Sequence, residues 1–149
     1  MFKIPIDWGT IKGEKKTLDA ILLECVKLRD RKCQHCGEDG TLKPGKKRRA
    51  ALQAAHIYPK GKYPHLRWDL ENVILLCSLC HIFWWHKDPI AVYVWMIENL
   101  SDQFEIIKKR AEVRPHKATN GSRQMWKIYL FQEWKRLRKE SISSCPEPV

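Results

Sequence analysis

The chain has 149 residues, of which 44% are hydrophobic and 30% are charged, a composition typical of one globular domain with a modest apolar core. Lysine and arginine number 28 against 17 aspartates and glutamates, so the formal net charge is +11. A positive field of this size favours a polyanion, above all nucleic acid, as the partner. The alternative is a basic surface that serves solubility alone.

Membrane and secretion signals are not evident in the sequence. No run approaches the roughly 18 apolar residues that span a bilayer, and residues 1–5 do not resemble a signal peptide. The termini also lack the pattern of a basic amphipathic helix or a lipidation motif. We therefore expect an intracellular, cytoplasmic protein with no membrane partner.

The six cysteines are distributed unlike those of a secreted disulfide scaffold. Four of them form two C-x2-C pairs, which leaves Cys25 and Cys145 alone. Cys25 lies in an apolar helical pattern and is predicted to be a small buried hydrophobe. Cys145 lies in a Ser/Pro-rich tail and is predicted to be a free thiol.

The first elements lead up to the first cysteine pair. Residues 1–16 alternate apolar side chains and then become lysine-rich, which predicts an extended arm. Apolar residues then recur at helical spacing, which predicts a helix over residues 17–30 with Thr17 as its N-cap. Residues 38–49 predict a turn-rich loop with a basic tip, and that tip could contact phosphates or be a solvated hairpin end. The tip consists of Lys46, Lys47, Arg48 and Arg49.

Two strands and a helix are predicted in the middle of the chain. Residues 50–57 suit a strand with His56 near its end, and residues 58–71 contain prolines and glycine that predict an ordered loop. Asn72 then precedes a short apolar run over residues 73–76, which predicts a buried strand. A helix should follow from Ser78 to about His86.

The remainder of the chain is predicted to be helical. Asp88 is placed to cap a helix over residues 89–99, and a second helix should span about 101–112. A basic loop over 114–121 then precedes a final helix over 122–140. The final helix carries an apolar stripe at spacings of three and four that we assign to the core: Trp126, Leu130, Trp134 and Leu137.

The paired cysteines predict a structural zinc site. Zinc takes four ligands in a tetrahedron, with Zn–S bonds of about 2.3 Å, and two C-x2-C turns supply four thiolates. The ligands are Cys33, Cys36, Cys77 and Cys80. The 40 residues between the two pairs exceed the roughly 15–20 of a simple zinc ribbon, so the insert should form a structure of its own. His35, between the first two ligands, is expected to face solvent.

Within this insert, the run Ala55-His56-Ile57 and the later run from Asn72 to His81 resemble the HNH nuclease family. The cysteine pair upstream matches the zinc-stapled members of that family. The resemblance implies an α+β fold, in which a small ββα-metal core is stapled by a four-cysteine zinc site and joined by an N-terminal helix and additional C-terminal helices. Residues 66–73 are also similar, more weakly, to the NinG group of phage recombination proteins, which implies a phage-encoded protein acting in the host cell.

The resemblance also implies a domain organisation and a set of roles. Residues 1–149 would form a single HNH nuclease domain with its core at about 33–86, an N-terminal helical part at about 17–30 and a helical C-terminal extension at about 89–140. His56 matches the general base, and His81 matches the residue that binds the catalytic divalent ion, which could be Mg²⁺, Mn²⁺ or another ion. Asn72 matches the middle asparagine, which hydrogen-bonds across the loop and keeps His56 aimed.

One departure from the family pattern concerns the ion. Many members have Asp or His just before the base, as a second metal ligand, but this chain has Ala55. His86 is a candidate replacement, although five residues along an α-helix it would point about 140° away from His81. Alternatively, His86 contacts a phosphate or is an ordinary surface residue. Arg67 is either a phosphate clamp or the partner of Asp69 or Glu71.

These observations favour a metal-dependent DNA endonuclease or nickase, which would leave a 5′ phosphate and a 3′ hydroxyl as the resemblance implies. A nuclease of branched recombination DNA is an alternative within the same class. In a different class, a zinc-stabilised module could bind nucleic acid without cutting it, and Ala55 keeps that alternative open. The partner would be double-stranded or branched DNA in each case, and the sequence does not indicate an oligomeric state.

Overall fold

The computed structural model describes residues 14–144. The predicted arm therefore lies outside the described residues except for residues 14–16, which are helical. Cys145, the predicted free thiol, also lies outside them. Within this range, no helix has both the length and the apolar character that crossing a bilayer requires.

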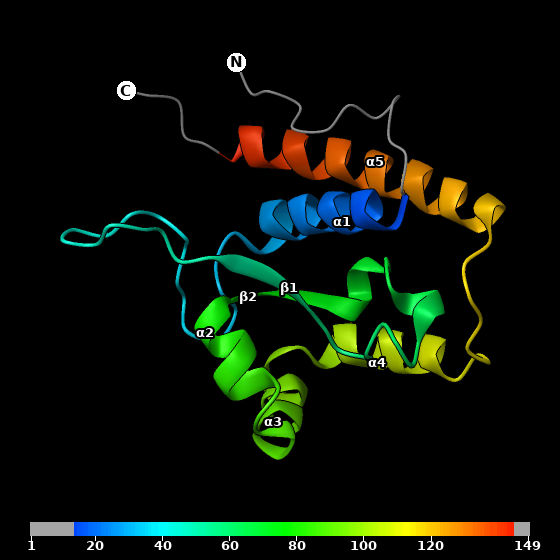
Figure 1. Cartoon of the computed structure of the whole chain (residues 1–149), viewed down its shortest axis with the longest axis horizontal. Helices are drawn as coiled ribbons and strands as arrows, with labels where there is room; N and C mark the ends of the chain where they lie inside the picture. Colours follow the sequence, from blue (N-terminus) through cyan, green and yellow to red (C-terminus); the bar gives the residue numbers. More distant parts are fainter. Residues whose placement is uncertain (1–13, 145–149) are drawn as a thin grey trace.

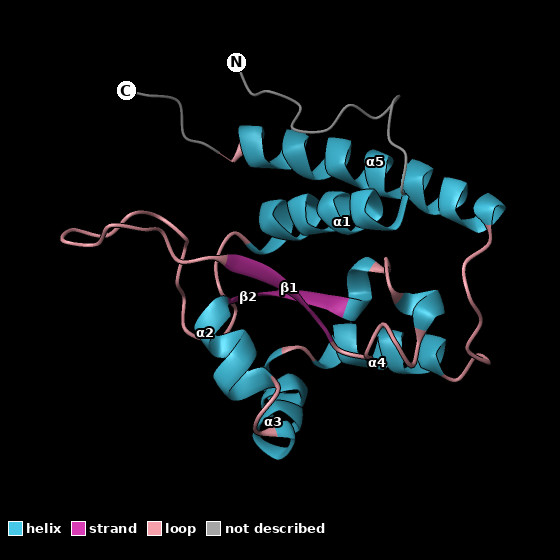
Figure 2. Ribbon diagram, viewed as in Figure 1, coloured by secondary structure: helices cyan, strands magenta, loops and turns pink. Residues whose placement is uncertain are grey.

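A two-stranded antiparallel sheet lies at the centre of the fold. Strand β1 (Leu52–His56) pairs with β2 (Val73–Cys77) so that Leu52 faces Cys77 and His56 faces Val73. Figure 1 shows α1 and α5 on one side of the sheet and α2, α3 and α4 on the other, and Figure 2 shows how small the sheet is beside the helices. The predicted α+β class is confirmed.

All five residues of β2 are buried, and its first four residues alternate between two apolar clusters. Val73 and Leu75 belong to the cluster shared with α1 and α5. Ile74 and Leu76 belong to the cluster shared with α3 and α4. This alternation is the period-two geometry of a strand with apolar material on both faces, and it explains why the run has no polar residue.

The first layer consists of α1 (Glu14–Asp30) and α5 (Asn120–Ser143). Helix α1 begins three residues before the prediction, so Thr17 lies within its first turn and the prediction that it is the N-cap is wrong. In α5 the predicted stripe does face the core, because Leu130 and Leu137 are buried there. Thr119 forms a capping box with Ser122, which lets α5 begin before the predicted start.

Cys25 contributes to this layer as predicted. Its side chain is fully buried, and its thiol donates to the carbonyl oxygen of Leu130 on α5 at 3.4 Å. Burial raises the pKa of the Cys25 thiol to about 12, so the group stays protonated and unreactive at neutral pH.

The second layer contains α3 (Pro89–Asn99) and α4 (Ser101–Ala111), close to their predicted bounds. Asp88 caps α3 as predicted, because its carboxylate accepts from the Ala91 amide at 3.1 Å. Trp85 is buried against the sheet side of this layer, whereas Trp84 reaches Trp95 of α3 edge-on. The adjacent tryptophans therefore have separate packing partners.

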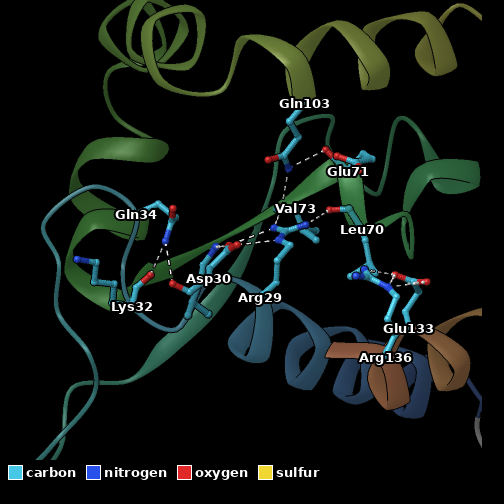
Figure 3. A network of polar contacts seen from close by, with 11 residues as sticks. Arg29, Asp30, Lys32, Gln34, Leu70, Glu71, Val73, Gln103, Glu133 and Arg136 are labelled. Carbon is cyan, nitrogen blue, oxygen red and sulfur yellow. Dashed lines mark hydrogen bonds and ion pairs between the residues drawn. The ribbon is translucent and has the colours of Figure 1, made fainter. Parts of the chain in front are cut away.

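Polar side chains join both layers to the backbone at the start of β2 (Figure 3). From α1, Arg29 donates to the carbonyl oxygens of Leu70 and Val73, at 2.7 Å each. From α4, Gln103 donates to Glu71 and Val73, at 3.0 Å each. These bonds engage the carbonyls that flank Asn72 where the sheet begins, and Leu70 O also accepts from the Val73 amide.

Candidate metal centre and active site

The four paired cysteines converge at one place. Their Sγ atoms all lie within 4.8 Å of one another, and those of Cys36 and Cys77 are 3.7 Å apart. Tetrahedral zinc with bonds of about 2.3 Å separates its sulfur ligands by about 3.8 Å. The donor set and its spacing therefore fit zinc, and the structure brings the four predicted cysteines together in one cluster that could hold the ion.

Each cysteine pair is shaped by backbone hydrogen bonds. In the first pair, the Gly37 amide donates to Cys33 O at 2.9 Å, and Gly37 has a φ of 79°, which glycine adopts without strain. In the second pair, Cys77 ends β2 and its sulfur accepts from the Cys80 amide at 3.5 Å. Both turns direct amide groups toward sulfur, as thiolate ligands require.

The first cysteine turn is anchored to the sheet through Leu75. The Gln34 amide donates to Leu75 O at 2.9 Å, and the Leu75 amide donates to the Asp30 carboxylate at 2.9 Å. Burial opposes a charge on Cys33, but surrounding backbone amides outweigh burial and lower the pKa of this thiol to about 7. Cys33 is thus ready to bind a metal as the thiolate.

His35 has a contact that the sequence did not indicate. It is exposed, as predicted, but its Nδ1 lies 3.3 Å from the Cys80 sulfur. Its ring also stacks on Trp84, with 3.6 Å between ring centroids and 9° between planes. His35 therefore covers the cysteine cluster from outside and connects it to the following helix.

The predicted catalytic histidines line a separate pocket of about 540 Å³. Strand β1, the loop after it, the helical turn after Cys80 and helix α3 enclose this pocket. His56, His81 and His86 all line it, so the structure brings His56 together with two histidines that lie at least 25 positions later in the sequence. The other lining residues are Ala54, Ile57, Pro59, Lys60, Gly61, Trp85, Pro89, Val92, Tyr93 and Met96.

His56 is the last residue of β1, and its Nε2 lies 2.8 Å from the carbonyl oxygen of Arg67. A carbonyl can only accept, so Nε2 carries the proton and Nδ1 keeps the lone pair. Burial lowers the pKa of His56 below its usual 6.5, and this effect exceeds the opposing one of the Arg67 carbonyl. At neutral pH His56 is therefore in the basic form, with one defined nitrogen able to take a proton.

Asn72 holds the loop that supplies this carbonyl. It is fully buried, and its amide donates to Tyr58 O and Leu66 O at 3.0 Å each. Its Oδ1 accepts from the Tyr58 amide at 2.8 Å. These bonds connect the residues after His56 to the residue before Arg67, which is the cross-loop geometry expected of the middle asparagine.

Asn72→Ala is expected to lower the free energy of unfolding by about 3 kcal/mol, because three buried hydrogen bonds are lost and the Tyr58 amide is left unsatisfied. Urea denaturation measures the change. Asn99→Ala is the matched control, since Asn99 is exposed and makes one bond to Trp95 O. Equal stability of the two variants would contradict a structural role for Asn72.

His81 is oriented by Gln53, a residue that no sequence pattern singles out. The Nδ1 of His81 lies 2.7 Å from Gln53 Oε1. With Nδ1 donating to this oxygen, Nε2 is left with the lone pair that a metal ligand needs. Burial, followed by the nearby charges of His86 and His56, lowers the pKa of His81, which favours the neutral form that binds metals.

His86 lies beside His81, and the expectation that it points about 140° away is wrong. The predicted helix from Ser78 is α-helical only over α2 (Ser78–Cys80) and continues as a π-helix, η3, over His81–Trp85. The i→i+5 bonding of a π-helix brings residues five apart onto one face. The ring centroids of His81 and His86 are consequently 4.6 Å apart.

Position 55 does not contribute to the pocket. Ala55 is fully buried in the second-layer cluster, whereas its neighbours Ala54 and His56 line the pocket. This position supplies no carboxylate, and His81 and His86 are the two neighbouring side chains of the pocket whose ring nitrogens could bind an ion. Two imidazoles on one helical turn are a donor set that a divalent transition ion accepts.

Arg67 has a structural partner, and it is neither of the two considered from the sequence. Its guanidinium binds the Asp19 carboxylate of α1 through two hydrogen bonds of 2.9 and 2.6 Å. Asp69 instead accepts two bonds of 2.7 Å from Arg110. The Asp19 pair holds the loop whose carbonyl orients His56, so Arg67 supports the site through its backbone, and the Nε and Nη2 groups of its side chain are engaged by Asp19.

The comparisons with known proteins agree with this geometry. No curated protein and no solved structure matches the chain significantly. One family model, described as HNH endonuclease, matches residues 33–82. This segment begins at the first zinc-type cysteine, contains β1 and β2, and ends just after His81. The resemblance to the HNH family found in the sequence is thereby confirmed over residues 33–82.

Proposed function

We propose that this protein is a metal-dependent endonuclease or nickase that hydrolyses phosphodiester bonds in DNA. The observation that supports it most directly is that two histidines in one pocket have complementary tautomers. His56 presents the lone pair of Nδ1, and His81 presents that of Nε2, because the opposite nitrogen of each ring faces an oxygen acceptor. One imidazole is thus prepared to take a proton and the other to bind a cation.

In this proposal each residue has one task. His56 takes the proton from the attacking water as its oxygen bonds to phosphorus, and Asn72 keeps the loop that orients His56 in place. His81 and His86 would hold the divalent ion. When bound, the ion polarises a phosphoryl oxygen and offsets the charge on the leaving oxygen. The zinc group would keep the two strands and the helix in register.

Incubation with supercoiled plasmid tests the proposed activity. The zinc-loaded protein should convert plasmid to nicked or linear DNA in Mg²⁺ or Mn²⁺ and not without a divalent ion. DNA binding with no cleavage in any divalent ion would instead favour the non-catalytic binding module. Comparing a four-way junction with a linear duplex decides the substrate, since equal cutting of both would count against a branched-DNA nuclease.

His81→Ala and His86→Ala are each expected to raise the Mn²⁺ concentration needed for half-maximal cleavage, by about tenfold or more, because the ion loses one of two ligands. Cleavage measured across a Mn²⁺ titration checks this. His116→Ala is the matched control, because His116 is exposed and stacks on His65 outside the pocket. An unchanged Mn²⁺ requirement in His86→Ala would restrict the site to a single histidine.

The exposed basic tip is proposed as a DNA contact. Residues 41–50 are all exposed, and Figure 1 shows this loop extending away from the body of the protein. Lys43 is bound to Asp39 at 2.8 Å, whereas the four following cations extend beyond that pair. They are Lys46, Lys47, Arg48 and Arg49.

Replacing these four residues by glutamine is expected to reduce the slope of log K against log salt by up to about 3.6, since each lost phosphate contact accounts for about 0.9. Fluorescence anisotropy of a duplex at several salt concentrations measures the slope. The comparison variant replaces four exposed lysines of α4 and α5, at positions 108, 109, 135 and 139. The same slope in both variants would place the contacts elsewhere than the loop.

A further inference from the structure

The charges around the histidine pocket are unusual for a cation site. Among the residues that line it, all within the described range, there is no aspartate or glutamate. His81 and His86 are neutral ligands when they bind a metal, so they would leave the full double charge of the ion uncompensated. The only permanently charged side chain among the lining residues is Lys60, which is also positive.

Lys60 is held at the pocket by the fold of its loop. The Ile57 amide donates to Asn72 O at 2.8 Å, which fixes the chain directly after His56. A turn follows, in which the amides of Lys62 and Tyr63 donate to Pro59 O at 3.1 and 2.8 Å. Lys60 lies within this turn, and its positive charge acts on His56, where it contributes to lowering the pKa.

The acid on which the charge of Lys60 acts, Asp19, is already engaged. The charge of Lys60 also acts on Asp19, but both oxygens of that carboxylate accept from Arg67, and one of them accepts from the Trp68 indole at 2.9 Å. Within residues 14–144, no ion pair or side-chain hydrogen bond holds the Lys60 ammonium. Lys60 is therefore an exposed cation beside the base, without an acidic partner of its own among the described residues.

We propose that Lys60 binds the scissile phosphate, and that this phosphate supplies the negative charge the pocket lacks, so that the divalent ion and the nucleic acid bind cooperatively. The inference rests on the proposed function and adds a substrate-binding residue to it. A lysine and a divalent ion in one pocket repel each other until an anion lies between them, and a phosphodiester is such an anion. The phosphodiester would thereby supply the negative charge that Ala55, at the position before the base, does not.

Cooperativity of this kind is reciprocal. If the ion tightens DNA binding by some factor, DNA must tighten ion binding by the same factor, and coupled sites typically show about 5- to 150-fold. The free protein should hence bind Mn²⁺ weakly. Removing Lys60 should weaken DNA binding while leaving the affinity of the free protein for Mn²⁺ unchanged or higher, because a repelling charge is gone.

The experiment uses the zinc-loaded full chain carrying His56→Ala, in which cleavage is expected to be slower by about two to four orders of magnitude, so that binding can be measured in Mn²⁺ before much DNA is cut. Anisotropy of a fluorescent duplex gives the DNA affinity with and without Mn²⁺, and electron paramagnetic resonance of free Mn²⁺ gives ion binding without DNA. Lys60→Ala, Lys60→Arg and Lys62→Ala are compared in this background. Lys62 is an exposed lysine of the same turn that lies over the Tyr63 ring and outside the pocket.

Three results are expected. Mn²⁺ tightens DNA binding at least fivefold. Lys60→Ala weakens Mn²⁺-dependent DNA binding about tenfold and Lys62→Ala about twofold, with Lys60→Arg close to the parent. Lys60→Ala does not weaken Mn²⁺ binding in the absence of DNA. A substitution that damaged the pocket would weaken it. Equal effects of Lys60→Ala and Lys62→Ala would overturn the role of Lys60, and DNA affinity independent of Mn²⁺ would overturn the cooperativity.

Failure of this inference can be told apart from failure of the proposed function. If the wild-type protein cleaves plasmid and Lys60→Ala, made in the wild-type chain, cleaves as Lys62→Ala does, the nuclease proposal stands and the role of Lys60 falls. If the wild-type protein never cleaves but binds DNA with dependence on both Mn²⁺ and Lys60, the pocket is a phosphate site without hydrolysis. In that case the inference stands and the proposed activity falls.

Discussion

His56→Ala is expected to reduce the rate of phosphodiester cleavage by two to four orders of magnitude, since a positioned general base contributes about 10²- to 10⁴-fold. The loss should appear in single-turnover plasmid cleavage at saturating Mn²⁺, where binding is not limiting. The folded state should persist, because the ring makes one hydrogen bond, to Arg67 O. His116→Ala, which alters a histidine outside the pocket, should cleave at the wild-type rate, and undiminished cleavage by His56→Ala would remove His56 from the mechanism.

The pH dependence of cleavage gives a second measure of the same residue. Burial lowers the pKa of His56 below 6.5, and only the neutral ring can take a proton from water. The rate should therefore rise with pH through a midpoint below 6.5 and then level off. A midpoint clearly above 7 would show that the rate depends on a group other than His56, or that the pKa of His56 is raised and not lowered.

Removal of zinc is expected to unfold the protein. Structural zinc binds with about 10–16 kcal/mol in zinc-finger peptides at pH 7, whereas domains are stable by only about 5–15 kcal/mol. The ligands here fix both ends of the HNH segment, since Cys33 follows α1 and Cys77 ends β2. Loss of the ion would leave four thiols side by side. The two cysteine turns would then no longer be joined through a common metal ion.

Far-UV circular dichroism during chelation, together with a chromophoric chelator that counts released zinc, measures this effect. Cys77→Ser should contain less than one zinc per chain and should not regain helical signal when zinc is added back. Cys25→Ala is the matched control, because Cys25 is buried away from the cluster and its loss should leave one zinc per chain. A spectrum that stays unchanged after confirmed zinc release would refute the structural role.

Features that show as a regular spacing of residues in the sequence were predictable. The helices of the second layer and the strand over Val73–Cys77 follow from apolar spacing, because burial requires that spacing. The cysteine cluster followed from paired spacing, because a tetrahedral ion needs two such turns. The order of His56, Asn72 and His81 was sufficient to indicate the family but not the geometry that makes their nitrogens complementary.

Features decided by a local competition or by a distant partner were not predictable. Whether a turn after Cys80 is α or π depends on which carbonyls the following amides reach, and no single residue type determines this. That choice alone moved His86 onto the face of His81. Arg67 had two acids within four positions, yet it pairs with Asp19, 48 residues away, because the fold of α1 against the loop outweighs proximity in sequence.

The alternation of β2 between two apolar clusters also has a consequence for how the protein unfolds. Val73 and Leu75 cannot leave one cluster without withdrawing Ile74 and Leu76 from the other, so the helical pair α1 and α5 and the layer of α3 and α4 are coupled through one five-residue strand. Amide hydrogens in β2 should consequently exchange only through global opening. Damage to either helical layer would be transmitted to Asn72 at one end of the strand and Cys77 at the other, so catalysis and metal retention should fail together on denaturation.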